Sequence, residues 1–438
     1  MAAGWTYAEA LADLDGRINL EATIAGRASA PTLERIAALT GAMGEPQRAC
    51  PVVHVTGTNG KGSTAAMVTA LLAGRGLTVG TYTSPDLVRV NERIARNGEP
   101  IADEELAEAL QAVAALEPVV GVRATRFELL TAAAYRWFAD QAVDAAVIEV
   151  GLGGRWDATN VADATVAVVT NVAEDHAELL GPTLVDIAGE KAGIVKPGSH
   201  LVLGVTDPVV AAPFRAAGPA ETWLRGTDFG AEEVAVAHGG RSADLVTPAA
   251  RYEQVYLPVY GAHQAANAAM AAAAAEAFFG TPIDDDDLRR ALSGLRLPGR
   301  LEVVGRQPLV VLDGAHNPAG AATAAAALAD DFVAISSRLL VVGLLRGRDP
   351  VEMLEPLLGA AGGATRLVVA CEPPSPRALP AEEVAAAARS LGVAADEAPS
   401  PAAALQAALA AAREDELVLV TGSLYLVGAI RALLAGTN

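Results

Sequence analysis

The sequence has little cysteine and few aromatic side chains. Cys50 and Cys371 are the only cysteines, and they lie far apart in the chain and form no CxxC pair. This spacing argues against a disulfide scaffold and a structural zinc site, and it favours a reducing, cytoplasmic environment. Aromatic residues make up only 4% of the chain, while alanine is abundant. We therefore expect an aliphatic, helix-rich core.

Positive charge and long apolar runs are scarce as well. The chain has 32 Lys plus Arg against 52 Asp plus Glu, for a net charge of -20. Such a charge disfavours nucleic acid or an anionic membrane surface as a partner. Residues 1–20 lack the pattern of a secretory signal, and no apolar run is long enough to span a bilayer. Anionic ligands must therefore be held by local Lys and Arg side chains, metal ions and helix N-termini.

Short apolar runs alternate with helical stretches in the first two thirds of the chain. This alternation is typical of a parallel, doubly wound α/β sheet. Open sheets of this kind bind ligands at the carboxyl ends of their strands. The predicted strands lie at residues 52–56, 145–150, 165–170 and 201–205, and helices follow at residues 261–279 and 284–295.

A break in the pattern divides the chain. The segment Leu297-Pro298-Gly299-Arg300 contains a Pro-Gly pair and is a candidate hinge. The length of the chain also exceeds what a single core usually organises. We therefore predict a larger domain at residues 1–297 and a smaller Rossmann-like domain at residues 298–438. Alternation restarts in the second domain, with strands at residues 309–312, 338–342, 367–370 and 416–420 and a helix at residues 319–328.

The strongest local signal is a strand followed by the glycine-rich segment from Gly57 to Ser63 and then a helix. Backbone N–H groups of such a loop can approach phosphate oxygens, and the helix N-terminus favours negative charge. The segment departs from GxxxxGK[ST], because it is two residues shorter and Gly62 separates Lys61 from Ser63. The alternative is a glycine-rich turn with no ligand. We predict an ATP-binding loop that uses Thr58, Asn59, Gly60, Lys61, Gly62 and Ser63.

Candidate magnesium ligands follow neighbouring strands. Glu149 ends the second predicted strand and is our first choice, and Asp175-His176 and Ser84 are further candidates. Taken singly, each could instead be a solvated or structural residue. Lys191 lies in a stretch of small and apolar residues, where burial would lower its pKa. A neutral lysine amine can react with carbon dioxide to give a metal-binding carbamate, whereas the alternative is an ordinary surface lysine.

Ordered motifs along nearly the whole chain resemble those of folylpolyglutamate synthase, which is often bifunctional with dihydrofolate synthase and belongs to the Mur ligase superfamily. The resemblance rests on the segments 57–64, 84–87, 91–94, 149–160, 190–194, 261–267, 298–300, 313–318 and 421–423.

The resemblance implies a Mur-type P-loop ATPase domain joined to a Rossmann-like C-terminal domain. It also implies an ATP-dependent amide ligation, in which a pteroate or folate carboxylate is phosphorylated and then attacked by the amino group of L-glutamate. The expected partners are ATP, dihydropteroate, reduced folates and L-glutamate, and the expected protein is a cytoplasmic monomer. The resemblance leaves both dihydropteroate and reduced folates open as acceptors.

The resemblance also implies roles for individual residues. Thr58 to Lys61 would cradle the phosphates, and Ser84, Glu149, His176 and carbamylated Lys191 would hold two magnesium ions. Lys61, Lys191 and His176 are the predicted catalytic side chains. The nucleotide would also be contacted by Asn267, Arg300, Asp313 and His316. The pterin-bearing substrate would lie against Thr125, Arg126, Phe127, Glu128, Arg155, Trp156 and Asp157.

Four positions depart from the family pattern: Asp86 stands where His is common, Arg126 where an aromatic is common, Trp156 where Leu is common, and Glu174 where an apolar residue is usual. These departures bear on substrate preference more than on reaction type. A Mur-type ligase for another carboxylate acceptor is the main alternative, although the short segment before Gly57 argues against a nucleotide-sugar substrate. A non-enzymatic, ATP-gated binding module is the second alternative.

Overall fold

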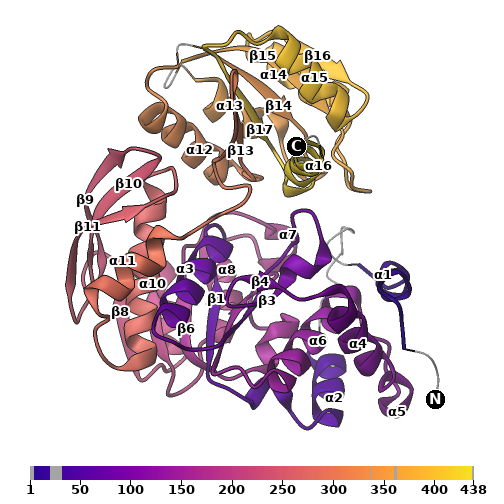
Figure 1. The fold of residues 1–438 in the computed structure, drawn as a ribbon, viewed down its shortest axis with the longest axis vertical. Coiled ribbons are helices and arrows are strands. Elements are labelled where there is room, and N and C mark those ends of the chain that lie inside the picture. The colour runs from indigo at the N-terminus through magenta and orange to yellow at the C-terminus, as the bar shows by residue number, and fades with distance from the viewer. Residues whose placement is uncertain (1–3, 20–31, 336, 360–362, 437–438) are drawn as a thin grey trace.

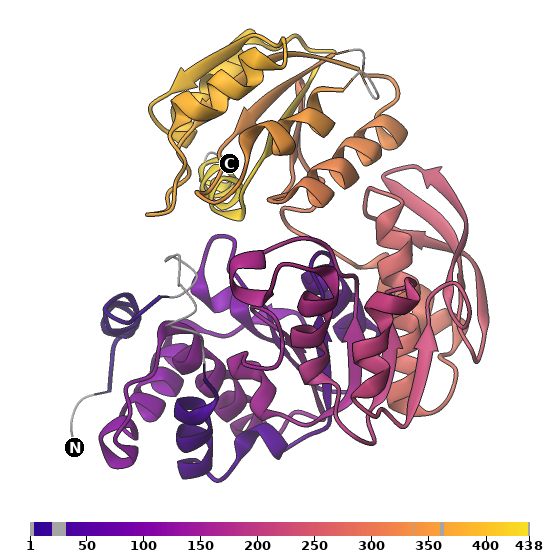
Figure 2. The ribbon, with the colours of Figure 1, turned by 180° about the vertical axis from the view of Figure 1, so that it is seen from behind.

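Two parallel-type sheets and one small antiparallel sheet organise the computed structural model, which describes residues 4–19, 32–335, 337–359 and 363–436. The C-terminal sheet and its helices form a separate layered unit next to the larger N-terminal part, as Figures 1 and 2 show from opposite sides. The chain passes between the two parts at residues 297–301, close to the predicted hinge. The domain boundary at residue 297 stays a prediction that this position supports.

The first sheet has eight strands in the order β4-β3-β2-β5-β1-β6-β7-β8. All neighbours are parallel except at the edge formed by β3 and β4. The four strands predicted in this part are confirmed within two residues at either end. The strands are β1 (Val52–Thr56), β2 (Val79–Tyr82), β3 (Ile94–Arg96), β4 (Glu99–Pro100), β5 (Ala145–Glu149), β6 (Ala164–Val169), β7 (His200–Leu203) and β8 (Glu221–Leu224).

Helices cover both faces of this sheet, so every residue of β1 and β5 is buried. Successive side chains of a strand point to opposite faces. Val53 and Val55 therefore pack with α3 (Lys61–Gly74), α10 (His263–Phe279) and α11 (Asp285–Ser293). On the other face Val52 packs with α1 (Tyr7–Asp15), α2 (Glu34–Ala42), α4 (Asp103–Ala114) and α6 (Arg126–Asp140).

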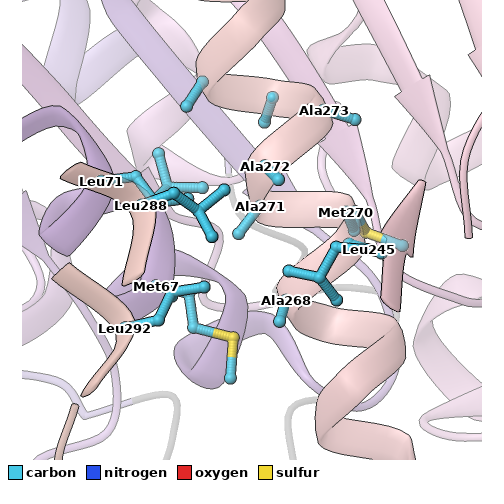
Figure 3. Packing of buried hydrophobic residues seen from close by; sticks show 14 of the residues in the cluster. Met67, Leu71, Leu245, Ala268, Met270, Ala271, Ala272, Ala273, Leu288 and Leu292 are labelled. Carbon is cyan, nitrogen blue, oxygen red and sulfur yellow. The ribbon is translucent and has the colours of Figure 1, made fainter. Parts of the chain in front are cut away.

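The abundance of alanine has its structural explanation in α10. This helix is buried along most of its length, and its small side chains lie between Met67 and Leu71 of α3, Leu288 of α11 and Leu245 of β10 (Figure 3). Small side chains let these elements approach closely while they keep the interior dense. The predicted aliphatic core is thereby confirmed.

Three antiparallel strands in the order β11-β10-β9 lie against α10. No strand was predicted here, because β9 and β11 each carry two exposed charged residues and lack a continuous apolar run. The strands are β9 (Gly230–Ala237), β10 (Gly240–Val246) and β11 (Arg251–Leu257).

The C-terminal sheet has the order β12-β13-β17-β14-β15-β16, and only β12 is antiparallel. The four strands and the helix predicted in this part are confirmed, and β12 and β16 were not predicted. The elements are β12 (Glu302–Arg306), β13 (Leu309–Leu312), α12 (Pro318–Asp331), β14 (Ser337–Val342), α13 (Pro350–Leu358), β15 (Ala364–Cys371), α14 (Ala381–Ser390), β16 (Ala395–Ala398), α15 (Pro401–Ala411), β17 (Leu417–Thr421) and α16 (Leu424–Ala435).

The remaining helices are short connections, several of which border the functional site. They are the 3-10 helices Pro46–Arg48, Val90–Arg93, Ala158–Val161 and Ala192–Ile194, and α5 (Glu117–Val120), α7 (Ala177–Leu180), α8 (Leu184–Lys191) and α9 (Pro208–Ala216). Within the described ranges, no helix combines the length and apolar character that crossing a membrane requires.

Candidate active site

A cavity of about 360 Å³ lies at the carboxyl ends of β1 and β5 and is lined from both parts of the molecule. It lies where an open α/β sheet binds its ligands. All predicted site residues except Arg126 and Arg155 line this cavity. The lining includes Thr58, Asn59, Gly60, Lys61, Gly62, Ser63, Ser84, Thr125, Phe127, Glu128, Glu149, Trp156, Asp157, His176, Lys191, Asn267, Arg300, Asp313 and His316.

The glycine-rich loop follows β1 and leads directly into α3, which begins at Lys61. Gly57 has φ +149°, and a Cβ added there would lie 1.8 Å from Oγ1 of Thr170, so only glycine fits. The backbone N–H of Thr58 donates to the carbonyl oxygen of Asn171 at 3.0 Å, and that of Asn59 donates to Asn171 Oδ1 at 3.0 Å. These bonds fix the course of the loop, and they occupy the backbone N–H groups of Thr58 and Asn59.

Lys61 brings positive charge to this loop. Its Nζ donates to the carbonyl oxygens of Gly57 and Thr58, each at 3.1 Å. No carboxylate forms an ion pair with Lys61 within the described part of the chain. The charge is therefore available to an anionic ligand in the cavity.

Glu149 ends β5 beside the loop and is buried, so the interpretation of a merely solvated carboxylate at a strand end is wrong. Its Oε2 accepts a hydrogen bond from the backbone N–H of Ser84 at 3.2 Å. Burial raises the pKa of Glu149, and the nearby positive charge of Lys61 opposes this shift. A Cβ at Gly62 would lie 3.4 Å from Oε2, so the glycine lets α3 start next to the carboxylate.

These oxygens have the chemistry that Mg²⁺ prefers. The described residues contain no cluster of three or more His, Cys, Asp or Glu side chains that could hold a metal ion. Magnesium does not need such a cluster, because it keeps several waters and is bound through one or two carboxylates together with substrate phosphates. Glu149 is buried and lies beside the hydroxyl-bearing residue Ser84, and it forms no ion pair with any residue that the structure describes. This pair of residues therefore fits magnesium.

Asp175 and His176 follow β6 and face the same cavity. His176 Nε2 lies 3.5 Å from Asp175 Oδ1, and Arg348 Nη2 lies 2.6 Å from the same oxygen. Burial lowers the pKa of His176, which favours the neutral imidazole that can bind a metal. Burial would raise the pKa of Asp175, but His176 and Arg348 outweigh this effect and hold that pKa below its ordinary range.

Lys191 is the last residue of α8 and is buried inside the site. Its Nζ donates to the carbonyl oxygen of Gly57 at 3.0 Å. Burial, together with the positive charge of Lys61, lowers the pKa of Lys191 to about 7. The interpretation of an ordinary surface lysine is wrong, because Lys191 is buried and its burial favours the neutral amine.

Five of the seven side chains predicted to bind the pterin-bearing substrate line the cavity. Thr125 and Glu128 cap the start of α6 through reciprocal hydrogen bonds, at 3.2 and 2.8 Å. Phe127 packs against Gly151, where an added Cβ would lie 2.6 Å from its ring. Trp156 is 48% exposed, so it is not a core aromatic. Phe127 and Trp156 therefore offer apolar faces to a planar ligand.

Three further residues of the predicted substrate set have partners within the protein. Arg126 pairs with Asp15 at 2.8 Å, and Arg155 Nη2 donates to the carbonyl oxygen of Gly189 at 3.1 Å, so both lie outside the cavity lining. Asp157 is buried and accepts from the backbone N–H of Leu152 at 2.9 Å. This contact holds the loop that follows β5.

The C-terminal part contributes Arg300, Asp313 and His316 to the lining. Asp313 accepts from the backbone N–H of Leu301 at 3.0 Å and from that of Ala315 at 2.9 Å. His316 Nδ1 donates to the carbonyl oxygen of Gly314 at 2.9 Å, so Nε2 is the acceptor, and burial lowers the pKa of His316 to about 4. From the N-terminal part, Asn267 lies next to the loop, because a Cβ at Gly60 would lie 3.0 Å from its Oδ1.

Two further side chains at this junction, Asn317 and Arg348, were not predicted from the sequence. Asn317 stands within the motif at residues 313–318, so the motif itself was a signal that could have found it. Arg348 stands in a loop after β14, with no motif to single it out.

Models of two protein families match the chain. The Mur ligase middle domain matches residues 55–275, and the Mur ligase, glutamate ligase domain matches residues 299–424. The dihydrofolate synthase/folylpolyglutamate synthase of Mycobacterium tuberculosis is 38% identical and covers 82% of this chain and 77% of the relative. The folylpolyglutamate synthase of Lacticaseibacillus casei is 38% identical and covers 92% of this chain and 94% of the relative.

Solved structures agree with these sequence matches. The Mycobacterium tuberculosis folylpolyglutamate synthase complexed with ADP superposes with a TM-score of 0.89 at 34% sequence identity and covers 98% of both chains. The same arrangement of middle and C-terminal domains thus spans nearly the entire length of this protein. The chain belongs to the folylpolyglutamate synthase/dihydrofolate synthase family of Mur ligases.

Proposed function

We propose that this protein uses ATP to join L-glutamate to the carboxylate of a folate-type acceptor. The single observation that carries the proposal is the convergence of the phosphate loop, Glu149 and Lys191 in one cavity that is also lined by residues of the C-terminal part. The family membership of the chain supports the same reaction, because its relatives are named for glutamate ligation to folates.

The chemistry requires activation, because oxide is too poor a leaving group for an amine to displace from a carboxylate. In the first step a carboxylate oxygen of the acceptor attacks the γ-phosphorus of ATP, the bond to the bridging oxygen breaks, and ADP leaves. In the second step the amino nitrogen of glutamate attacks the acyl carbon and loses a proton, and phosphate leaves. Each bond that forms is matched by one that breaks.

The residues of this chain supply the electrostatic part of that scheme. Lys61 and Arg300 bring positive charge to a phosphoryl group whose transfer concentrates negative charge. Ser84, Glu149, His176 and carbamylated Lys191 would hold magnesium, which neutralises phosphate charge when bound. Asp313 and His316 line the cavity from the C-terminal side, where they would limit the access of water to a hydrolysable intermediate.

The acceptor is a pterin-bearing carboxylate. Phe127 and Trp156 line the cavity wall and can pack on a pterin ring. The Mycobacterium tuberculosis relative is named for both dihydrofolate and folylpolyglutamate synthesis, which supports dihydropteroate as a second acceptor. We also propose a cytoplasmic monomer, in line with the low cysteine content.

The decisive assay measures ADP release by the purified protein with ATP, magnesium, L-glutamate and either dihydropteroate or tetrahydrofolate. We expect turnover that depends on glutamate with at least one of these acceptors. Absence of such turnover with every reduced pterin acceptor would refute the proposal. The alternative is a binding module without catalytic activity. In that case Lys61→Ala would abolish nucleotide affinity, but the wild type would show no ligase activity.

A further inference from the structure

Asn317 lies fully buried at the junction of the two domains. It is the N-cap of α12, and its Oδ1 accepts from the backbone N–H of Gly320 at 2.8 Å. Its Nδ2 donates to Asn59 Oδ1 at 3.0 Å and to Asp175 Oδ2 at 3.1 Å. Nδ2 of Asn59 donates back to Asn317 Oδ1 at 3.3 Å. One side chain thus joins α12, the phosphate loop and the residue before His176.

These contacts use the full hydrogen-bonding capacity of the amide. A primary amide has two N–H donors and a carbonyl oxygen with two lone pairs. In Asn317 both donors and both acceptor sites have partners, and three of the four bonds cross from the C-terminal part to the N-terminal part. A helix cap needs only the acceptor oxygen, so capping alone does not explain the two donated bonds.

The other end of α12 is also fixed to the N-terminal part. Asp331, the last residue of the helix, lies 2.7 Å from Arg241 Nε of β10 and accepts from the backbone N–H of Gly261 at 2.6 Å. The helix has 14 residues, which corresponds to a length of about 21 Å. In Figure 1, α12 lies at the edge of the C-terminal part that faces the three-stranded sheet and α10. Both ends of α12 therefore contact the N-terminal part, and the N-terminal end does so at the phosphate loop.

We propose that Asn317 is a positioning residue that aligns the C-terminal domain with the phosphate loop for the ligation step. This inference rests on the proposed function. It adds that one side chain, Asn317, aligns the two domains for that reaction. The side-chain amide of Asn59 bonds to Asn317, so the loop that would receive the phosphates is tied directly to the start of α12. Loss of the two donated bonds would leave Asp313 and His316 poorly placed over the cavity and would admit water.

The variant Asn317→Ser separates the two roles, because serine also caps helices but has no second donor. Serine leaves Asn59 Oδ1 and Asp175 Oδ2 without these donors, so we expect a modest fall in the melting temperature. We expect kcat for amide formation to fall by about tenfold or more, as for the loss of hydrogen bonds that align reacting groups. The ratio of ADP released to amide formed should rise above one, because water then competes with glutamate for the activated carboxylate.

Two further variants keep the test decisive. Asn317→Asp keeps the cap and places a second carboxylate beside Asp175, so it should raise the same ratio at least as far. Ser400→Ala removes a comparable cap, that of α15, which lies away from the junction in Figure 1. The side chain of Ser400 accepts from the backbone N–H of Ala403. This control should leave the ratio at one. An unchanged kcat and ratio in Asn317→Ser would overturn the proposal.

A second measurement distinguishes failure of this inference from failure of the proposed function. Amide hydrogen exchange of residues 57–60 in the ligand-free protein needs no turnover. We expect faster exchange in Asn317→Ser than in the wild type and in Ser400→Ala. If the wild type shows no ligase activity, the proposed function fails while the exchange result still decides the role of Asn317. Equal exchange in all three proteins would overturn that role.

Discussion

Lys191 Nζ lies 3.0 Å from the carbonyl oxygen of Gly57, so a buried amine contacts the first residue of the phosphate loop. Lys61 Nζ donates to the same oxygen at 3.1 Å, so two amines share one acceptor. Their proximity is one reason why the pKa of Lys191 is low, after burial itself. A carbamate on Lys191 would relieve this repulsion by converting a cation into an anion beside Lys61.

Replacement of Lys191 by alanine should therefore lower the ligase rate by about a hundredfold or more, a typical loss for a group that stabilises developing charge. Added short-chain carboxylates such as acetate should restore part of the activity by taking the place of the carbamate. Steady-state rates with and without acetate provide the measurement. Lys196→Ala is the matched control, because Lys196 is a partly buried lysine outside the cavity lining. Full activity of Lys191→Ala would exclude the carbamate.

The variant Glu149→Gln should lose turnover without loss of stability. Burial raises the pKa of Glu149, so the ionised form destabilises the folded protein at neutral pH, and a neutral amide removes that cost. We expect the free energy of unfolding, measured with urea at pH 7, to be equal to or higher than that of the wild type. We expect turnover to fall by about a hundredfold or more, because the magnesium ligand is lost. Wild-type turnover in this variant would remove Glu149 from the metal site.

A single methyl group at position 57 should disable the loop. In Gly57→Ala the new Cβ meets Oγ1 of Thr170, and the residue would also need φ +149°, which L side chains rarely adopt. We expect calorimetric titration with ATP to show no binding. Gly41→Ala is the matched control, since nothing lies within 4 Å of an added Cβ at position 41. Normal ATP affinity in Gly57→Ala would contradict the assignment of the phosphate loop.

Glu416 gives a prediction for acid stability. Its carboxylate is buried and pairs with Arg366 at 2.8 Å, and hydrogen bonds from Arg366, the largest cause, lower its pKa to about 2. A lowered pKa means that the ionised group stabilises the fold above the ordinary value of 4.5 and loses this contribution as the pH falls toward 2. Glu416→Gln should cost about 2 kcal/mol at pH 7, typical of hydrogen bonds to a charged group.

Urea unfolding of the wild type and Glu416→Gln between pH 7 and pH 3 provides the check. The difference in unfolding free energy between the two proteins should shrink as the pH falls below 4.5. A difference that stays constant with pH would show that the charge of Glu416 plays no part.

The sequence predicts the parts of this molecule that depend on local pattern. Buried parallel strands such as β1 and β5 are mostly apolar, and their carboxyl ends bring Glu149 and the phosphate loop together as predicted. The strands β9 and β11 were not predicted, because charged residues on their exposed faces interrupt the apolar pattern. The contact of Asn59 with Asn317 joins residues 258 positions apart, and no local pattern encodes such a pairing.

The central claim is that ATP activates the acceptor carboxylate by phosphorylation, and an isotope experiment tests it most directly. The acceptor is labelled with ¹⁸O in its reacting carboxylate and incubated with enzyme, ATP, magnesium and L-glutamate, and the released phosphate is analysed by mass spectrometry. The account predicts that each phosphate formed together with an amide bond carries one ¹⁸O atom from the acceptor. Amide product accompanied by unlabelled phosphate would contradict it.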